Sequence, residues 1–100
     1  MNKKSNPFLN PLETHYPPPG RAAIEEYLEE KGVTYLAYGK WKKGKHAYRI
    51  AYRLELSLKL WSHVVERTLR EMAKRHRYHY YHHIVSFHPD NAKINVLLEQ

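Results

Sequence analysis

Residues 48–56, YRIAYRLEL, alternate strictly between two kinds of side chain. One set of positions holds Tyr48, Ile50, Tyr52, Leu54 and Leu56, and the other holds Arg49, Ala51, Arg53 and Glu55. A period of two is typical of a β-strand with one face on a core and the other in water. We therefore predict a strand here, with residues 33–41 as its antiparallel partner and residues 42–45, KKGK, as the turn.

Two other segments have the three- and four-residue spacing of amphipathic helices. The first spans residues 20–32, where Gly32 is suited to end a helix. The second begins after Ser57, a good N-cap residue, and runs to about residue 76. Its apolar stripe consists of Leu58, Trp61, Val65, Leu69, Met72 and His76.

A second hairpin is predicted from residues 82–88 and 92–98, with Pro89, Asp90 and Asn91 in the turn. The element order is then α-β-β-α-β-β. One four-stranded, mostly antiparallel sheet with both helices packed on one face would bury every apolar face found. The predicted fold class is α+β, in a single domain of residues 20–100.

Residues 1–19 contain five of the six prolines and are predicted to form an extended or disordered arm. Phe8, Leu9, Leu12 and Tyr16 give this arm apolar contacts for its own domain or for a protein partner. Together with the acidic first helix, the arm is compatible with a protein-binding adaptor or inhibitor. This is one alternative for the function.

The amino-acid composition restricts the kinds of protein that this chain can be. It has no cysteine, so disulfides and thiolate metal sites are excluded, and no apolar run approaches the ~20 residues of a membrane helix. We expect a soluble, cytoplasmic protein with no membrane partner. The many Lys, Arg, Glu and Tyr residues are typical of a heat-stable surface, and a homodimer would enlarge a small core.

The net charge of +7 is unevenly distributed. Between Lys40 and Arg77 there are twelve cations and three anions, whereas four glutamates cluster in the first helix. Such segregation attracts polyanions to one side of a protein, although a solvated basic surface is the alternative.

Nucleic acid, DNA or RNA, is the polyanion that this pattern favours, because Lys and Arg neutralise phosphates while aromatic rings stack on unpaired bases. Three basic surfaces are candidates for binding nucleic acid. If they lie next to one another in the fold, they would form one stripe that binds several phosphates. They are the turn (Lys40, Trp41, Lys42, Lys43, Lys45), the strand (Arg49, Arg53) and the helix (Arg67, Arg70, Lys74, Arg77).

Residues 74–83, KRHRYHYYHH, raise the question of histidine chemistry. On a continuing helix His76, His79 and His83 would share one face, whereas in a strand His82 and His83 would lie on opposite faces. Because no carboxylate is nearby and cations disfavour a bound metal, we predict neither a metal site nor a cofactor. The same cations are expected to lower the histidine pKa values.

The element order, the adjacent His82 and His83, and the closing strand KINVLL (residues 93–98) resemble the pterin-4a-carbinolamine dehydratases. These are small α+β proteins in which a helix ends at a His-His-Pro motif followed by two strands. The resemblance covers residues 21–98 and implies a catalytic role for His82 and His83, with Ile84 in place of the proline. A dehydratase-like domain is therefore a second alternative, beside a non-enzymatic nucleic-acid-binding protein.

Overall fold

The computed structural model describes residues 18–38 and 48–100. Helix α2 (Arg21–Glu30) precedes strands β1 (Thr34–Tyr38) and β2 (Arg49–Leu56). A continuous helical run follows, made of α3 (Leu58–Leu60), the π-helical segment η2 (Trp61–Val65) and α4 (Glu66–Arg75). Strands β3 (His79–Ser86) and β4 (Ala92–Glu99) complete the order.

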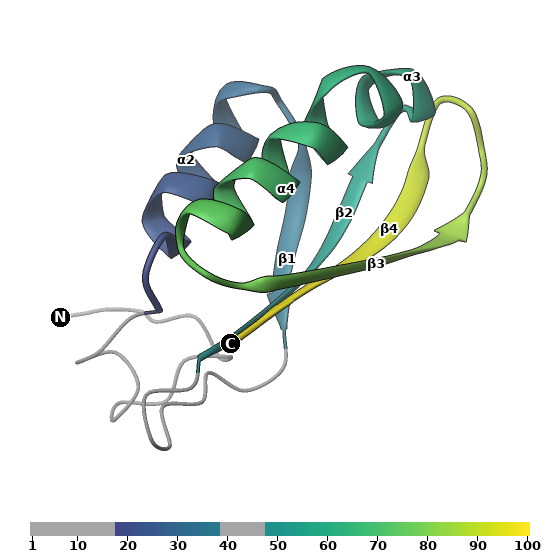
Figure 1. Cartoon of the computed structure of the whole chain (residues 1–100). Coiled ribbons are helices and arrows are strands. Elements are labelled where there is room, and N and C mark those ends of the chain that lie inside the picture. The colour runs from purple at the N-terminus through teal and green to yellow at the C-terminus, as the bar shows by residue number, and fades with distance from the viewer. Residues whose placement is uncertain (1–17, 39–47) are drawn as a thin grey trace, which may run out of the picture.

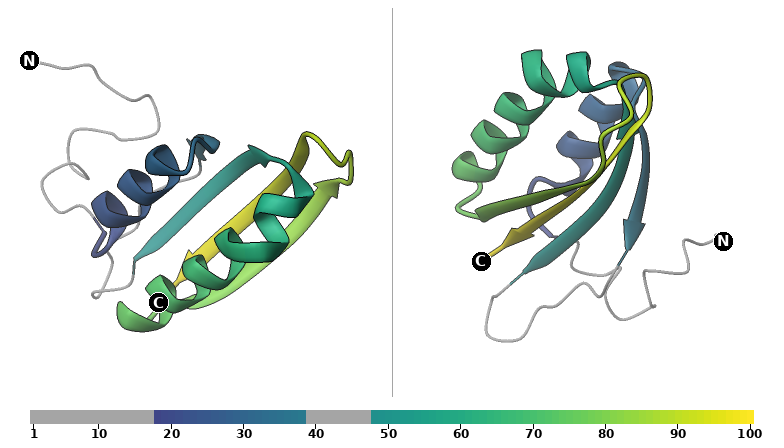
Figure 2. Two further views of the ribbon diagram at one scale, coloured as in Figure 1. Left: turned by 90° about the horizontal axis from the view of Figure 1, so that it is seen from above. Right: turned by 90° about the vertical axis from the view of Figure 1, so that its right-hand side faces the viewer.

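The four strands form one sheet in the order β1-β2-β4-β3, with every neighbouring pair antiparallel. The two αββ halves of the chain therefore lie side by side, and β2 meets β4 at the centre (Figure 1). Both helices lie on the same face of this sheet (Figure 2). The predicted α+β fold is confirmed.

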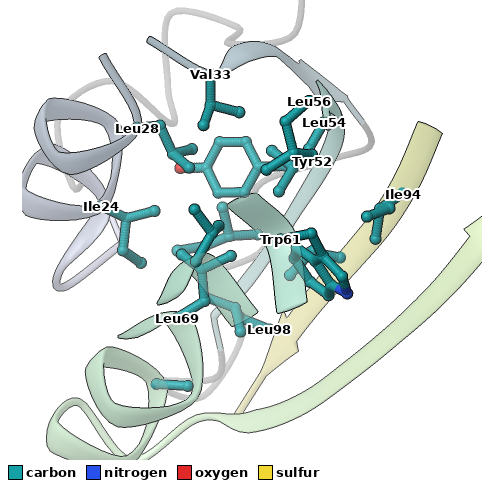
Figure 3. Packing of buried hydrophobic residues seen from close by; sticks show 14 of the residues in the cluster. Ile24, Leu28, Val33, Tyr52, Leu54, Leu56, Trp61, Leu69, Ile94 and Leu98 are labelled. Carbon is teal, nitrogen blue, oxygen red and sulfur yellow. The ribbon is translucent and has the colours of Figure 1, made fainter. Parts of the chain in front are cut away.

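The core lies between the helices and the sheet (Figure 3). It contains the inward positions predicted for the second strand, Ile50, Tyr52, Leu54 and Leu56, which are all buried. Ile24 and Leu28 of α2 and the helical residues Trp61 and Leu69 pack against them from the helix layer (Figure 3). Each large apolar side chain buried in this way contributes about 1.5–3 kcal/mol.

Both helices end in the same hydrogen-bonded motif. After α2 the amide of Val33 donates to the Leu28 carbonyl, at 2.9 Å. After α4 the amide of Tyr78 donates to the Ala73 carbonyl, at 2.8 Å. The residue before each of these amides, Gly32 or Arg77, has a positive φ, which reverses the chain and starts a strand.

This motif corrects the predicted start of the third strand. We expected residues 82–88, but β3 begins at His79, because the reversal at Arg77 leaves Tyr78 already extended toward the sheet. The helix therefore does not reach residue 83, and the shared helical face of His76, His79 and His83 does not exist.

The start of α2 is fixed to the end of α4. The hydroxyl of Tyr78 donates to the Pro19 carbonyl, at 2.7 Å, and Gly20 lies against the ring of His76.

Residues 1–17 of the predicted arm and residues 39–47, which contain the predicted basic turn, lie outside the described residues. Within residues 18–38 and 48–100, no helix has the length and apolar character needed to cross a membrane.

Candidate functional site

The sheet face opposite the helices, called the open face below, is covered by no helix of the described residues (Figure 2). Alternation places Arg49, Ala51 and Arg53 of β2 on this face, as the sequence predicts. Strand register then defines rows of side chains that cross the face. One row is Tyr38, Ala51, Leu97 and Tyr81, and the next is Leu36, Arg53, Asn95 and His83.

The first of these rows forms a hollow of about 220 Å³ on the open face. Tyr38 of β1 and Tyr81 of β3 stand at opposite ends of the row, with the small Ala51 and Leu97 between them. Main chain of β3 and β4 completes the lining. This site, called the slot below, is lined by Tyr38, Tyr81, His82, His83, Asn95, Val96 and Leu97.

The slot is a small hollow with a mainly apolar lining. It is smaller than the ~300–1,000 Å³ pockets that enclose whole drug-sized ligands. A second hollow of about 260 Å³ shares Tyr38 with the slot and is also lined by Leu36 and Arg53. The open face can therefore receive flat groups at neighbouring positions, with a cation beside them.

Large apolar side chains are exposed beside the slot. Leu36 is 54% exposed and Tyr81 53% exposed, and both belong to the rows that define the open face. Val85 and Phe87, at the end of β3 and just beyond it, are 45% and 67% exposed. Exposed apolar groups of this size, found at both edges of the sheet, indicate an interaction surface.

The two arginines of β2 have different partners across the sheet. Arg49 donates to the carboxylate of Glu99, which cancels its charge locally. Arg53 donates through Nε to Oδ1 of Asn95, at 2.8 Å. Because an amide carries no charge, this bond orients the Arg53 guanidinium and leaves its positive charge available at the centre of the open face.

The structure does not bring the helix cations to this face. Arg67, Arg70 and Lys74 lie on α4, which packs on the opposite side of the sheet (Figure 1). Arg70 is paired with Glu66 and lies over the ring of Tyr80, 4.5 Å from its centroid. Arg77 follows α4 at the chain reversal. The single stripe formed by strand and helix cations is therefore absent from the described part of the chain.

The adjacent His82 and His83 lie on opposite faces of the sheet, as expected for neighbours in a strand. His83 faces the slot, whereas His82 packs against Trp61 with 5.1 Å between ring centroids. Burial, followed by the charge of Arg70, lowers the pKa of His82. The direction agrees with the prediction, but burial is the main cause rather than the surrounding cations.

No metal site is found in residues 18–38 and 48–100, where no three His, Cys, Asp or Glu side chains converge. The predicted binding residues that do lie together are Arg49 and Arg53. The predicted binding residues did not include Tyr38, Tyr81 or Asn95, although Tyr81 belongs to the segment of residues 74–83 that was expected to supply stacking rings. The two tyrosines gave a signal, because each occupies the face of its strand that alternates with the core positions, where a large aromatic ring is unexpected.

Comparison of the chain with protein-family models, with curated proteins and with solved structures gives no match. The resemblance to pterin-4a-carbinolamine dehydratases is thus untested and stays a prediction.

Proposed function

We propose that this protein binds single-stranded nucleic acid on the open face of its sheet. The observation that carries the proposal is the slot, in which two tyrosines border an apolar floor next to the charged Arg53. Aromatic faces stack on any exposed base, and a guanidinium binds the phosphate that links two bases.

The geometry favours an unpaired strand over a duplex. A four-stranded sheet with aromatic side chains on its uncovered face is one of the ways in which proteins bind splayed bases. In a duplex the faces of the bases are stacked on each other and are not accessible to Tyr38 or Tyr81. The net charge of +7 adds a general attraction for the phosphate backbone.

The test is a fluorescence-anisotropy titration of labelled DNA and RNA oligonucleotides of about 12 nucleotides, single- and double-stranded, at two salt concentrations. We expect single strands to bind more tightly, with affinity falling as salt rises. Tyr81→Ala should weaken binding by about 1–3 kcal/mol through the loss of one stacked base. Arg53→Ala should also flatten the salt dependence.

The matched control removes cations from the opposite side of the molecule. Arg67→Ala combined with Lys74→Ala lowers the net charge by more than Arg53→Ala does, but leaves the open face intact. We expect this variant to keep most of the affinity. Failure of every oligonucleotide to bind at low salt would exclude the proposal, and a larger effect of the helix variant would move the site to α4.

The predicted dehydratase-like function implies that His82 and His83 act on the same substrate. His82 and His83 face opposite sides of the sheet, so one substrate cannot contact both rings within this chain. No observation in the described residues favours that reaction over binding on the open face.

A further inference from the structure

The orientation of the Asn95 amide is determined by its neighbour. Arg53 Nε carries a hydrogen and can only donate, so the Asn95 atom 2.8 Å away must be the accepting oxygen, Oδ1. The nitrogen, Nδ2, is then the end of the amide that remains for a ligand. No other hydrogen bond engages this side chain within the described residues.

Asn95 therefore offers a hydrogen-bond donor at the centre of the open face. Asn95 lines the slot and has the two hydrogens of Nδ2 to donate, and Arg53 lines the adjoining hollow with its two Nη groups free of the bond to Asn95. The edge of a planar ring bound in the slot would lie near these donors. An acceptor on that edge can receive a hydrogen bond from these donors. An amino group on that edge cannot, because it is itself a donor.

Resting on the proposed single-strand binding, we infer that the slot prefers bases that carry a carbonyl acceptor at the position where adenine carries its N6 amino group. Guanine presents N7 and O6, and thymine and uracil present O4, all of which are acceptors. Adenine presents N7 beside the N6 amino group, so one of its positions would meet a donor. The ligand class is thus a keto-base-rich single strand rather than any single strand.

The test compares adenine with hypoxanthine, which replaces the N6 amino group by a carbonyl oxygen and keeps the purine ring. Labelled deoxyadenosine and deoxyinosine oligonucleotides of about 12 nucleotides are titrated by anisotropy. The ratio of the two Kd values is the readout. Because one donor–acceptor pair is replaced by a donor–donor contact, we expect deoxyinosine to bind about three- to tenfold more tightly.

Two variants of Asn95 separate recognition from structure. Asn95→Ala removes Nδ2 and should bring the ratio close to one while binding continues. Asn95→Asp keeps the size and the bond from Arg53 but replaces the donor by an acceptor, so the ratio should shift toward deoxyadenosine. The negative charge that Asn95→Asp adds repels both oligonucleotides equally, so it does not change the ratio of their Kd values. Asn91→Ala removes the same kind of amide from the turn before β4 and should leave the ratio unchanged.

The outcomes distinguish this inference from the function on which it rests. Binding with equal Kd values for both oligonucleotides, or a preference that persists in both Asn95 variants, overturns the inference and leaves single-strand binding in place. Absence of binding to all oligonucleotides overturns both. A ratio that changes with Asn95 and not with Asn91 supports the inference.

Discussion

The hydroxyl of Tyr52, at the centre of β2, donates a hydrogen bond of 2.8 Å to Oε2 of Glu25 on α2. Tyr52 is 1% exposed, and burial followed by the charge of Glu25 raises its pKa far above the ordinary value, so the hydroxyl keeps its proton. Arg21 donates to the same oxygen at 3.1 Å, and Tyr35 donates to Glu29 at 2.8 Å. The acidic face of α2 is therefore joined to the sheet by tyrosines.

Replacement of Glu25 by alanine should destabilise the fold. The Tyr52 hydroxyl would remain buried without its acceptor, which costs about 1–3 kcal/mol in the free energy of unfolding. Urea denaturation measures this loss. The control is Glu26→Ala, which removes an exposed carboxylate from the next position of the helix. Equal effects of the two substitutions would show that the hydrogen bond contributes no stability.

Replacement of Arg77 by glycine should stabilise the protein. Arg77 has a φ of 66°, a conformation that costs a residue with a side chain about 1–2 kcal/mol. Part of this gain is lost to the greater freedom of glycine in the unfolded chain, so we expect a net increase of about 0.5–1 kcal/mol. Glu71→Gly, at an exposed position inside α4, should instead destabilise by a similar amount. Thermal and urea denaturation of the two variants would reveal the opposite signs.

Much of the fold follows from the sequence because local patterns and the core agree. The alternation around Tyr52, the cap at Ser57 and the glycine at position 32 each correspond to a feature of the structure: Ser57 Oγ accepts from the Leu60 amide, at 3.1 Å. The start of β3 could not be predicted in this way. It depends on a positive φ at Arg77, a residue type that gives no signal for a chain reversal.

The candidate site was predicted less completely, because charge alone does not say which face of a sheet a residue occupies. Arg53 was found through alternation, but the helix cations were grouped with it although the sheet separates them. Tyr38 and Tyr81 lie at the two ends of one row only because of the strand order, which places β1 and β3 at opposite edges of the same sheet. That order is a tertiary property with no counterpart in local spacing.

Replacement of Gly20 by alanine should be more harmful than the same change at Gly32. Both glycines have positive φ, 81° and 73°, so both changes carry the cost of about 1–2 kcal/mol. At Gly20 the new Cβ would also come within 2.5 Å of the His76 ring, whereas at Gly32 nothing lies within 4 Å. We expect the Gly20 variant to lose more stability in urea, and His76→Ala to reduce the difference. Equal losses at both glycines would show that the ring moves aside freely.

The stability of the protein should fall in mild acid partly through His82. Its pKa in the folded state is below the ordinary 6.5, because of burial and then of Arg70, with Glu66 opposing them. As the pH falls past 6.5, the unfolded chain therefore binds a proton that the folded chain does not, and the free energy of unfolding decreases. His82→Phe keeps a ring beside Trp61 and removes the titration, so denaturation between about pH 7 and pH 5 should show a smaller loss than in the wild type. Arg70→Gln should also reduce the loss of stability, since it removes one cause of the lowered pKa. If the free energy of unfolding depends on pH in the same way in all three proteins, His82 is not the group responsible.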